Sequence, residues 1–134
     1  MSKVTVLCFS NSGILASGSR DKTVIIWNLK EGRPNLEPFK GHKESIKCLA
    51  FSYNEEWIAS GSKDFSIILW SANNGKMEKS LDGHLDTVMC LEFSENGRNI
   101  CSGKYLQFTE NTNICFKSKI FQSHNLIFWP FILF

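Results

Sequence analysis

The sequence has no apolar stretch long enough to cross a lipid bilayer. Its longest apolar run, residues 126–134, spans nine residues and contains a proline, whereas a membrane-spanning helix needs about 20. The start of the chain also lacks the apolar segment of a secretory signal, since only residues 4–9 precede a turn. No Asn-x-Ser/Thr glycosylation site occurs. We therefore expect an intracellular protein, cytoplasmic or nuclear, without a membrane span.

An excess of basic charge is missing as well. The chain has 15 Lys and Arg against 13 Asp and Glu, and within residues 1–103 the two signs balance at 12 each. Binding to a phosphate backbone requires a basic stripe. The charge pattern therefore predicts that nucleic acid is not a partner.

The cysteines lack the spacing of a metal site or a disulfide framework. There are five, an odd number, and no Cys-x-x-Cys pair. Three of them lie in apolar stretches that resemble strands, where a cysteine packs as a small buried thiol. We expect reduced structural cysteines, no metal and no cofactor.

Helical periodicity is also absent, and short alternating runs separated by turns take its place. Gly41-His42 recurs as Gly83-His84, and residues 41–61 share 10 of 21 identities with residues 83–103. A second match relates residues 16–21 to residues 59–64. The expected strands are 14–19, 23–27, 45–52, 57–62, 66–70 and 87–94. A repeat of about 42 residues made of short antiparallel strands predicts an all-β fold built from propeller blades.

These residues resemble the WD40 repeat family. Its repeat has Gly-His, a strand ending in Phe-Ser, then Ala-Ser-Gly-Ser-x-Asp, and a strand ending in Trp. The resemblance covers residues 3–103 and implies an incomplete β-propeller of four-stranded antiparallel blades. We expect blade 1 at 1–41, without its Gly-His start, blade 2 at 42–83, and the first two strands of a third blade at 84–103. A closed ring needs at least about four blades, so unpaired blade edges predict self-association.

The resemblance stops after Gly103. Leu106 and Thr112 stand where the repeat would place Asp and Trp. We interpret residues 104–134 as a divergent, apolar C-terminal tail unrelated to the blades and not a domain. Our hypothesis is read-through from an unspliced intron or an alternative last exon. A docking tail and a diverged third blade remain the alternatives.

His42, Ser60 and Asp64 match a nucleophile–base–acid set in residue type, so a serine hydrolase is one alternative. The same serine and aspartate recur, however, with a tryptophan six residues later. The resemblance implies that these residues form a buried hydrogen-bond network with a structural role, because buried polar atoms need partners. We therefore predict a protein that is not an enzyme. The expected network comprises Ser17, Asp21, Trp27, His42, Ser60, Asp64, Trp70, His84 and Ser102.

The resemblance also implies a face that contacts partners, at the start of each inner strand and just before the turn aspartate. The matching residues are Lys3, Thr5, Arg20, Ser45, Lys47, Lys63, Thr87 and Met89. This face is mildly basic, which suits an acidic or phosphorylated protein segment. The predicted function is a non-enzymatic protein–protein interaction module, a fragment of a scaffold or adaptor. A truncated or alternatively spliced isoform with no independent function is the other possibility.

Overall fold

The computed structural model describes the backbone of residues 3–109, 112–116 and 119–122, and the side chains of residues 3–104. Its elements are short strands joined by turns, and no helix occurs within these ranges. The prediction of an all-β fold is confirmed. The strands expected at 57–62, 66–70 and 23–27 agree with observed strands to within one residue at each end.

Sheet 1 holds the first five strands. It runs in the order β1-β2-β3-β4, and β5 pairs with the other end of β3. All its pairings are antiparallel. The strands are β1 (Val4–Phe9), β2 (Leu15–Ser19), β3 (Thr23–Asn28), β4 (Arg33–Pro34) and β5 (Phe39–Lys40).

Sheet 2 is a four-stranded antiparallel meander in the order β6-β7-β8-β9. Its strands are β6 (Ile46–Phe51), β7 (Trp57–Ser62), β8 (Ile67–Ser71) and β9 (Met77–Leu81). The register repeats that of sheet 1: Val4 pairs with Ser19, Ile46 pairs with Ser62, and each pair is followed by an irregularity. The internal repeat in the sequence is therefore also a repeat of strand pairing.

Sheet 3 contains a strand that the sequence did not predict. β10 (Cys90–Phe93) pairs with β11 (Asn99–Gly103), and β14 (Lys119–Gln122) pairs with the other edge of β11. A separate hairpin, β12 (Tyr105–Thr109) and β13 (Thr112–Phe116), lies between them in the chain. The sequence assigned only two strands to this repeat. Because an open strand edge offers unpaired backbone groups, a segment without the repeat's side-chain pattern can still add to it.

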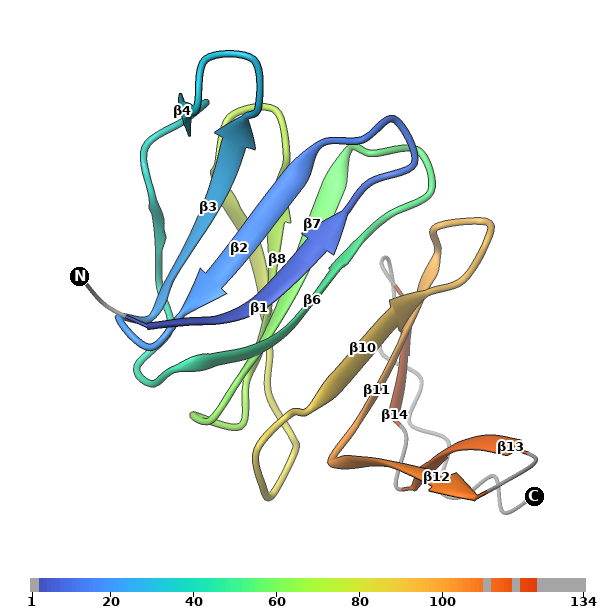
Figure 1. Cartoon of the computed structure of the whole chain (residues 1–134). Coiled ribbons are helices and arrows are strands. Elements are labelled where there is room, and N and C mark those ends of the chain that lie inside the picture. The colour runs from blue at the N-terminus through green and yellow to red at the C-terminus, as the bar shows by residue number, and fades with distance from the viewer. Residues whose placement is uncertain (1–2, 110–111, 117–118, 123–134) are drawn as a thin grey trace.

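The sheets are arranged side by side, with sheet 2 between sheets 1 and 3 and with the strands β1, β6 and β10 adjacent (Figure 1). Side chains of β8 alternate between two cores. Ile68 and Trp70 pack with residues of sheet 1, whereas Ile67 and Leu69 pack with residues of sheet 3. Each interface between sheets thus has its own apolar core, and sheet 2 contributes one face to each.

Two equivalent glycines allow the sheets to approach closely. A Cβ atom at Gly18 would lie 2.5 Å from Cγ2 of Ile46 in the next sheet. A Cβ atom at Gly61 would lie 2.5 Å from Sγ of Cys48 in the same sheet and 2.7 Å from Cγ1 of Val88, which precedes β10 of the next sheet. The glycine of the Ala-Ser-Gly-Ser segment therefore makes room for a β-branched side chain of the following repeat.

Candidate functional site

A buried polar network joins strands β7 and β8 of sheet 2 to the loop before β6 and to the β7–β8 turn. The indole Nε1–H of Trp70 donates to Oγ of Ser60 at 2.7 Å. Nε2 of His42 lies 2.8 Å from the same Oγ, and Nδ1 of His42 lies 3.0 Å from Oδ2 of Asp64. The structure therefore brings together the four residues that the sequence proposed for this repeat.

Asp64 orients the histidine ring. Its carboxylate accepts hydrogen bonds from the hydroxyl of Ser66 at 2.6 Å and from the backbone N–H groups of Ser66 and Lys43. Because a carboxylate can only accept, the proton of His42 sits on Nδ1, and in the neutral ring Nε2 accepts from the Ser60 hydroxyl. Ser66 also lies 3.1 Å from Nδ1 of His42, so it is a fifth member that the sequence comparison missed.

The pKa of the Asp64 carboxyl falls from 3.8 to about 2. Burial alone raises this pKa, but the hydrogen bonds from Ser66 and Lys43 and the charge of His42 outweigh burial. The network therefore contains a carboxylate that stays ionised well into the acid range.

Sheets 1 and 3 carry partial copies of this network. In sheet 1 the indole of Trp27 donates to Oγ of Ser17 at 2.8 Å, while Asp21 accepts from the backbone and hydroxyl of Thr23. In sheet 3 Nε2 of His84 lies 2.7 Å from Oγ of Ser102. The positions where the repeat would supply Asp and Trp, Leu106 and Thr112, fall outside the described side chains.

The contacts of His42 with Ser60 and Asp64 have the hydrogen-bond order of a serine hydrolase triad. Ser60, however, has 0% of its surface exposed, and its hydroxyl oxygen is already engaged by Trp70. A nucleophile has to contact its substrate. The burial of Ser60 and the bond from Trp70 therefore favour a structural role for the set.

The basic residues of the expected contact face lie at one end of sheets 1 and 2. The backbone N–H of Arg20 donates to the carbonyl of Lys3 at 3.0 Å, and the N–H of Lys63 donates to the carbonyl of Ser45 at 3.0 Å. Lys3, Arg20 and Lys63 are exposed. The same backbone hydrogen bond in both repeats thus places a cation at the β2–β3 turn and at the β7–β8 turn.

Two residues assigned to this face are less exposed than its cations, since Ser45 is buried and Thr5 is half-buried. Ser45 is 8% exposed, so its side chain is buried. The hydroxyl of Thr5 lies 2.6 Å from the carbonyl of Ile46 and 3.1 Å from that of Gly18, so it joins sheet 1 to sheet 2. Contact of Thr5 and Ser45 with a partner stays a prediction, and both offer less exposed surface than the cations of this face.

The remaining residues of this face are only partly exposed. Lys47 and Thr87 are half-buried, and the N–H of Thr87 donates to the Asp86 carboxylate at 2.6 Å. Met89 is exposed, and its N–H donates to the carbonyl of Gly103. The accessible part of the face is therefore dominated by its three exposed cations.

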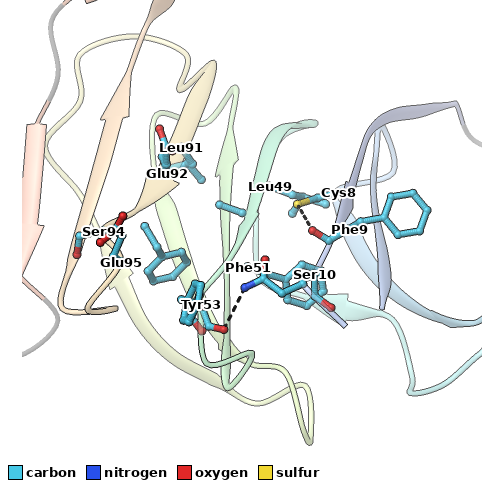
Figure 2. Close-up of a pocket in the computed structure, with 14 residues that line it drawn as sticks. Cys8, Phe9, Ser10, Leu49, Phe51, Tyr53, Leu91, Glu92, Ser94 and Glu95 are labelled. Atoms are coloured by element: carbon cyan, nitrogen blue, oxygen red, sulfur yellow. Dashed lines mark hydrogen bonds between the residues drawn. The ribbon is translucent and has the colours of Figure 1, made fainter. Parts of the chain in front are cut away.

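A groove that the sequence did not predict lies at the opposite end of the inner strands (Figure 2). It has a volume of about 530 Å³ and is formed by the ends of β1, β6 and β10 and the turns that follow them. The side-chain amide of Asn11 donates to the carbonyl of Tyr53 across it at 3.3 Å. A phenylalanine ends each inner strand, and this recurrence is the feature of the sequence that could have indicated the groove. It did not do so because a recurring apolar residue is equally expected in a core.

The described part of the chain shows neither a metal site nor a membrane-spanning helix. No group of three His, Cys, Asp or Glu side chains there is placed to hold a metal ion. No helix in that part is long and apolar enough to span a membrane.

Comparison with protein families gives a match to the model described as "WD domain, G-beta repeat" over residues 1–28, 33–71 and 75–114. Cell division control protein 4 of Saccharomyces cerevisiae is 44% identical over 46 residues, which cover 34% of this chain and 6% of that protein. The WD repeat-containing protein WDS homolog of Arabidopsis thaliana is 43% identical over 47 residues, which cover 34% of this chain and 9% of that protein. This chain therefore matches only a small part of each of these relatives.

Among solved structures, the crystal structure of RRP9 WD40 repeats superposes with a TM-score of 0.79. The superposition covers 92% of this chain and 36% of that chain, at 22% sequence identity. Identity this low shows the fold alone: an incomplete β-propeller, as the sequence predicted.

Proposed function

Because this chain belongs to the WD40 repeat family, we propose that it is a non-enzymatic protein-interaction module, part of a scaffold or adaptor, that binds an acidic or phosphorylated protein segment. WD40 domains bind proteins, and the family is generally non-enzymatic. The observation that carries the proposal is the placement of Arg20 and Lys63 by the same backbone hydrogen bond at the same end of neighbouring sheets.

The chemistry of these cations supports an anionic partner. Arg20 and Lys63 are exposed, and neither forms an ion pair with any residue that the structure describes. Guanidinium and ammonium groups form short, charge-assisted hydrogen bonds with carboxylates and phosphates. A segment that lies across both turns can therefore satisfy both cations at once.

We also propose how the chain divides into blades and where in the cell the protein is found. We place blade 1 at residues 1–41, blade 2 at 42–83 and the start of blade 3 at 84, with an intracellular location. The burial of Ser60 supports the absence of hydrolase activity. Burial of the Cys48 thiol is compatible with a reducing compartment.

The test is binding of a fluorescein-labelled hexaglutamate peptide and of its phosphoserine counterpart, measured by fluorescence anisotropy. The double variant Arg20→Glu/Lys63→Glu should weaken binding at least about tenfold, because it replaces attraction by repulsion at both turns. The matched control is Lys30→Glu/Arg98→Glu, which makes the same change of charge at exposed turns on the opposite end of the sheets.

Wild-type binding should also weaken as salt is raised, since exposed charges are screened. Equal losses of peptide affinity in the two double variants would mean that the net charge of the protein, and not the position of Arg20 and Lys63, determines binding. Absence of binding to both peptides would refute the proposed specificity for anionic segments.

A further inference from the structure

The groove at the ends of the inner strands has an apolar wall where sheets 2 and 3 meet (Figure 2). Phe51 ends β6, and Leu91 and Phe93 belong to β10. All three are half-buried: each packs against a core and keeps an accessible part. Tyr53, in the turn after β6, also lines the groove and is 70% exposed. This wall therefore offers a site for apolar side chains.

Strand β14 brings the chain to the same end of sheet 3. Gln122, the last residue that the structure describes, pairs with Asn99 at the start of β11. The carbonyl of Asn99 accepts from the backbone N–H of Ser94 at 3.0 Å, and Ser94 lines the groove. Because neighbouring strands lie about 4.8 Å apart, Gln122 is two strands, or about 10 Å, from Ser94. The chain that follows Gln122 thus starts beside the groove.

The segment after Gln122 has a short polar part and a longer apolar part. Residues 123–125 are Ser, His and Asn, whereas residues 126–134 are nine apolar residues that include one proline. Both parts lie outside the described residues. An extended chain spans about 3.3–3.6 Å per residue, so the four steps from Gln122 to Leu126 cover up to about 14 Å. The polar part is therefore long enough to bring residues 126–134, which we call the apolar segment, to the groove.

We propose that the apolar segment of the same chain occupies this groove. Contact with Phe51, Phe93 and Tyr53 removes its side chains from water, which is favourable. The groove volume of about 530 Å³ is in the range of sites that enclose a small ligand, so the groove takes a few of these side chains and not all of them. A short linker gives the segment a high effective concentration at the groove. A separate protein that binds there has to displace it first.

The experiment is photo-crosslinking within the whole chain. The photoreactive residue p-benzoylphenylalanine replaces Tyr53, which keeps an aromatic ring at the groove. The purified protein is irradiated at low concentration, digested with trypsin and analysed by mass spectrometry. We expect a crosslink to the tryptic peptide 120–134, which contains the apolar segment. The crosslinked protein should remain a monomer of about 15.3 kDa.

The matched control carries the same photoreactive residue in place of Leu29. This side chain is 57% exposed and lies in the β3–β4 turn, at the same end of the sheets but outside the groove. It should give no crosslink to the apolar segment. The control therefore separates occupation of the groove from general contact with this end of the molecule.

Two changes in the segment, each combined with the photoreactive residue at position 53, test the chemistry of the contact. Phe128→Asp should lower the crosslink yield at least about fivefold, because a carboxylate is costly to bury among apolar side chains. Asn125→Asp adds the same charge to the polar part and should leave the yield unchanged. Circular dichroism checks that both proteins keep the strand content of the wild type.

Any of four outcomes would overturn the proposal. A crosslink found only in dimers would assign the groove to the apolar segment of a second copy. No crosslink from position 53 to this segment, or an equal yield from position 29, would show that the segment does not occupy the groove. Equal yields for Phe128→Asp and Asn125→Asp would exclude an apolar contact. The groove and the exposed cations lie at opposite ends of the sheets, so this proposal and the binding of anionic peptides fail independently.

Discussion

Replacing Ser60 with alanine removes the hydroxyl on which the network of sheet 2 converges. That oxygen accepts from the indole of Trp70 at 2.7 Å and lies 2.8 Å from Nε2 of His42. Trp70 and His42 are both buried, so water cannot take over from the lost hydroxyl. The Ser60→Ala variant therefore leaves one buried donor without its partner and weakens the hydrogen bonding of a second group.

The magnitude follows from these two groups. A buried polar group without a partner costs about 1–3 kcal/mol. The indole N–H of Trp70 bears this cost in full, and Nε2 of His42, an acceptor in the neutral ring, loses the hydroxyl donor, because the carbonyl of Ser60 at 3.2 Å also only accepts. We expect the free energy of unfolding to fall by about 2–4 kcal/mol.

The assay is urea denaturation followed by tryptophan fluorescence and circular dichroism, and Ser17→Ala is the matched control. Ser17 accepts from Trp27 in the same way, but Trp27 is half-buried whereas Trp70 is 1% exposed, so the loss of the hydroxyl should cost less there. We expect Ser17→Ala to cost about 0.5–1.5 kcal/mol. Equal costs for the two variants, or a cost for Ser60→Ala below about 0.5 kcal/mol, would refute this reasoning.

Two further predictions use the same denaturation assay. The pKa of Asp64 is about 2 in the folded protein and 3.8 without its contacts. Its stabilising effect is therefore complete above pH about 4 and is lost as the pH falls towards 2. The difference in unfolding free energy between wild type and Asp64→Asn should shrink over that window, and a constant difference would contradict the role given to Asp64. Gly61→Ala should lower stability by about 1–3 kcal/mol, because its Cβ would lie 2.7 Å from Cγ1 of Val88, which precedes β10 of sheet 3. The control is Gly97→Asn, because a Cβ atom there would lie in open space at a φ of 66°, and it should cost less than about 1 kcal/mol of unfolding free energy. Equal losses of stability in Gly61→Ala and Gly97→Asn would show that the close approach of sheets 2 and 3 is unimportant.

Local pattern was sufficient to predict the strands, whereas the pairing of Trp with Ser was implied by the resemblance to the WD40 family. Strand boundaries followed from alternating apolar residues and turn signals, as for β7 at Trp57–Ser62. The spacing of ten residues between Ser60 and Trp70 places them on the same face of adjacent strands. These features depend on residues close in the chain, and the repeat displays them more than once.

Contacts between sheets could not be predicted in the same way. Thr5 occupies the position that Lys47 and Met89 occupy in the next two repeats, and the hydrogen bond of its hydroxyl to the carbonyl of Ile46 crosses the interface between sheets. Ser12 donates to the carboxylate of Glu55 in the next sheet, which lowers the pKa of Glu55. β14 pairs with β11, although the sequence of residues 119–122 does not follow the pattern of the repeat.

The most direct test of the central claim, that the recurring Trp, Ser, His and Asp stabilise the sheets from within, is hydrogen exchange of the indole N–H groups measured by NMR. The account predicts that the indole N–H of Trp70, bonded to Ser60 in the core, exchanges at least about tenfold more slowly than that of half-buried Trp27. Exchange of Trp70 as fast as that of Trp27 would contradict it.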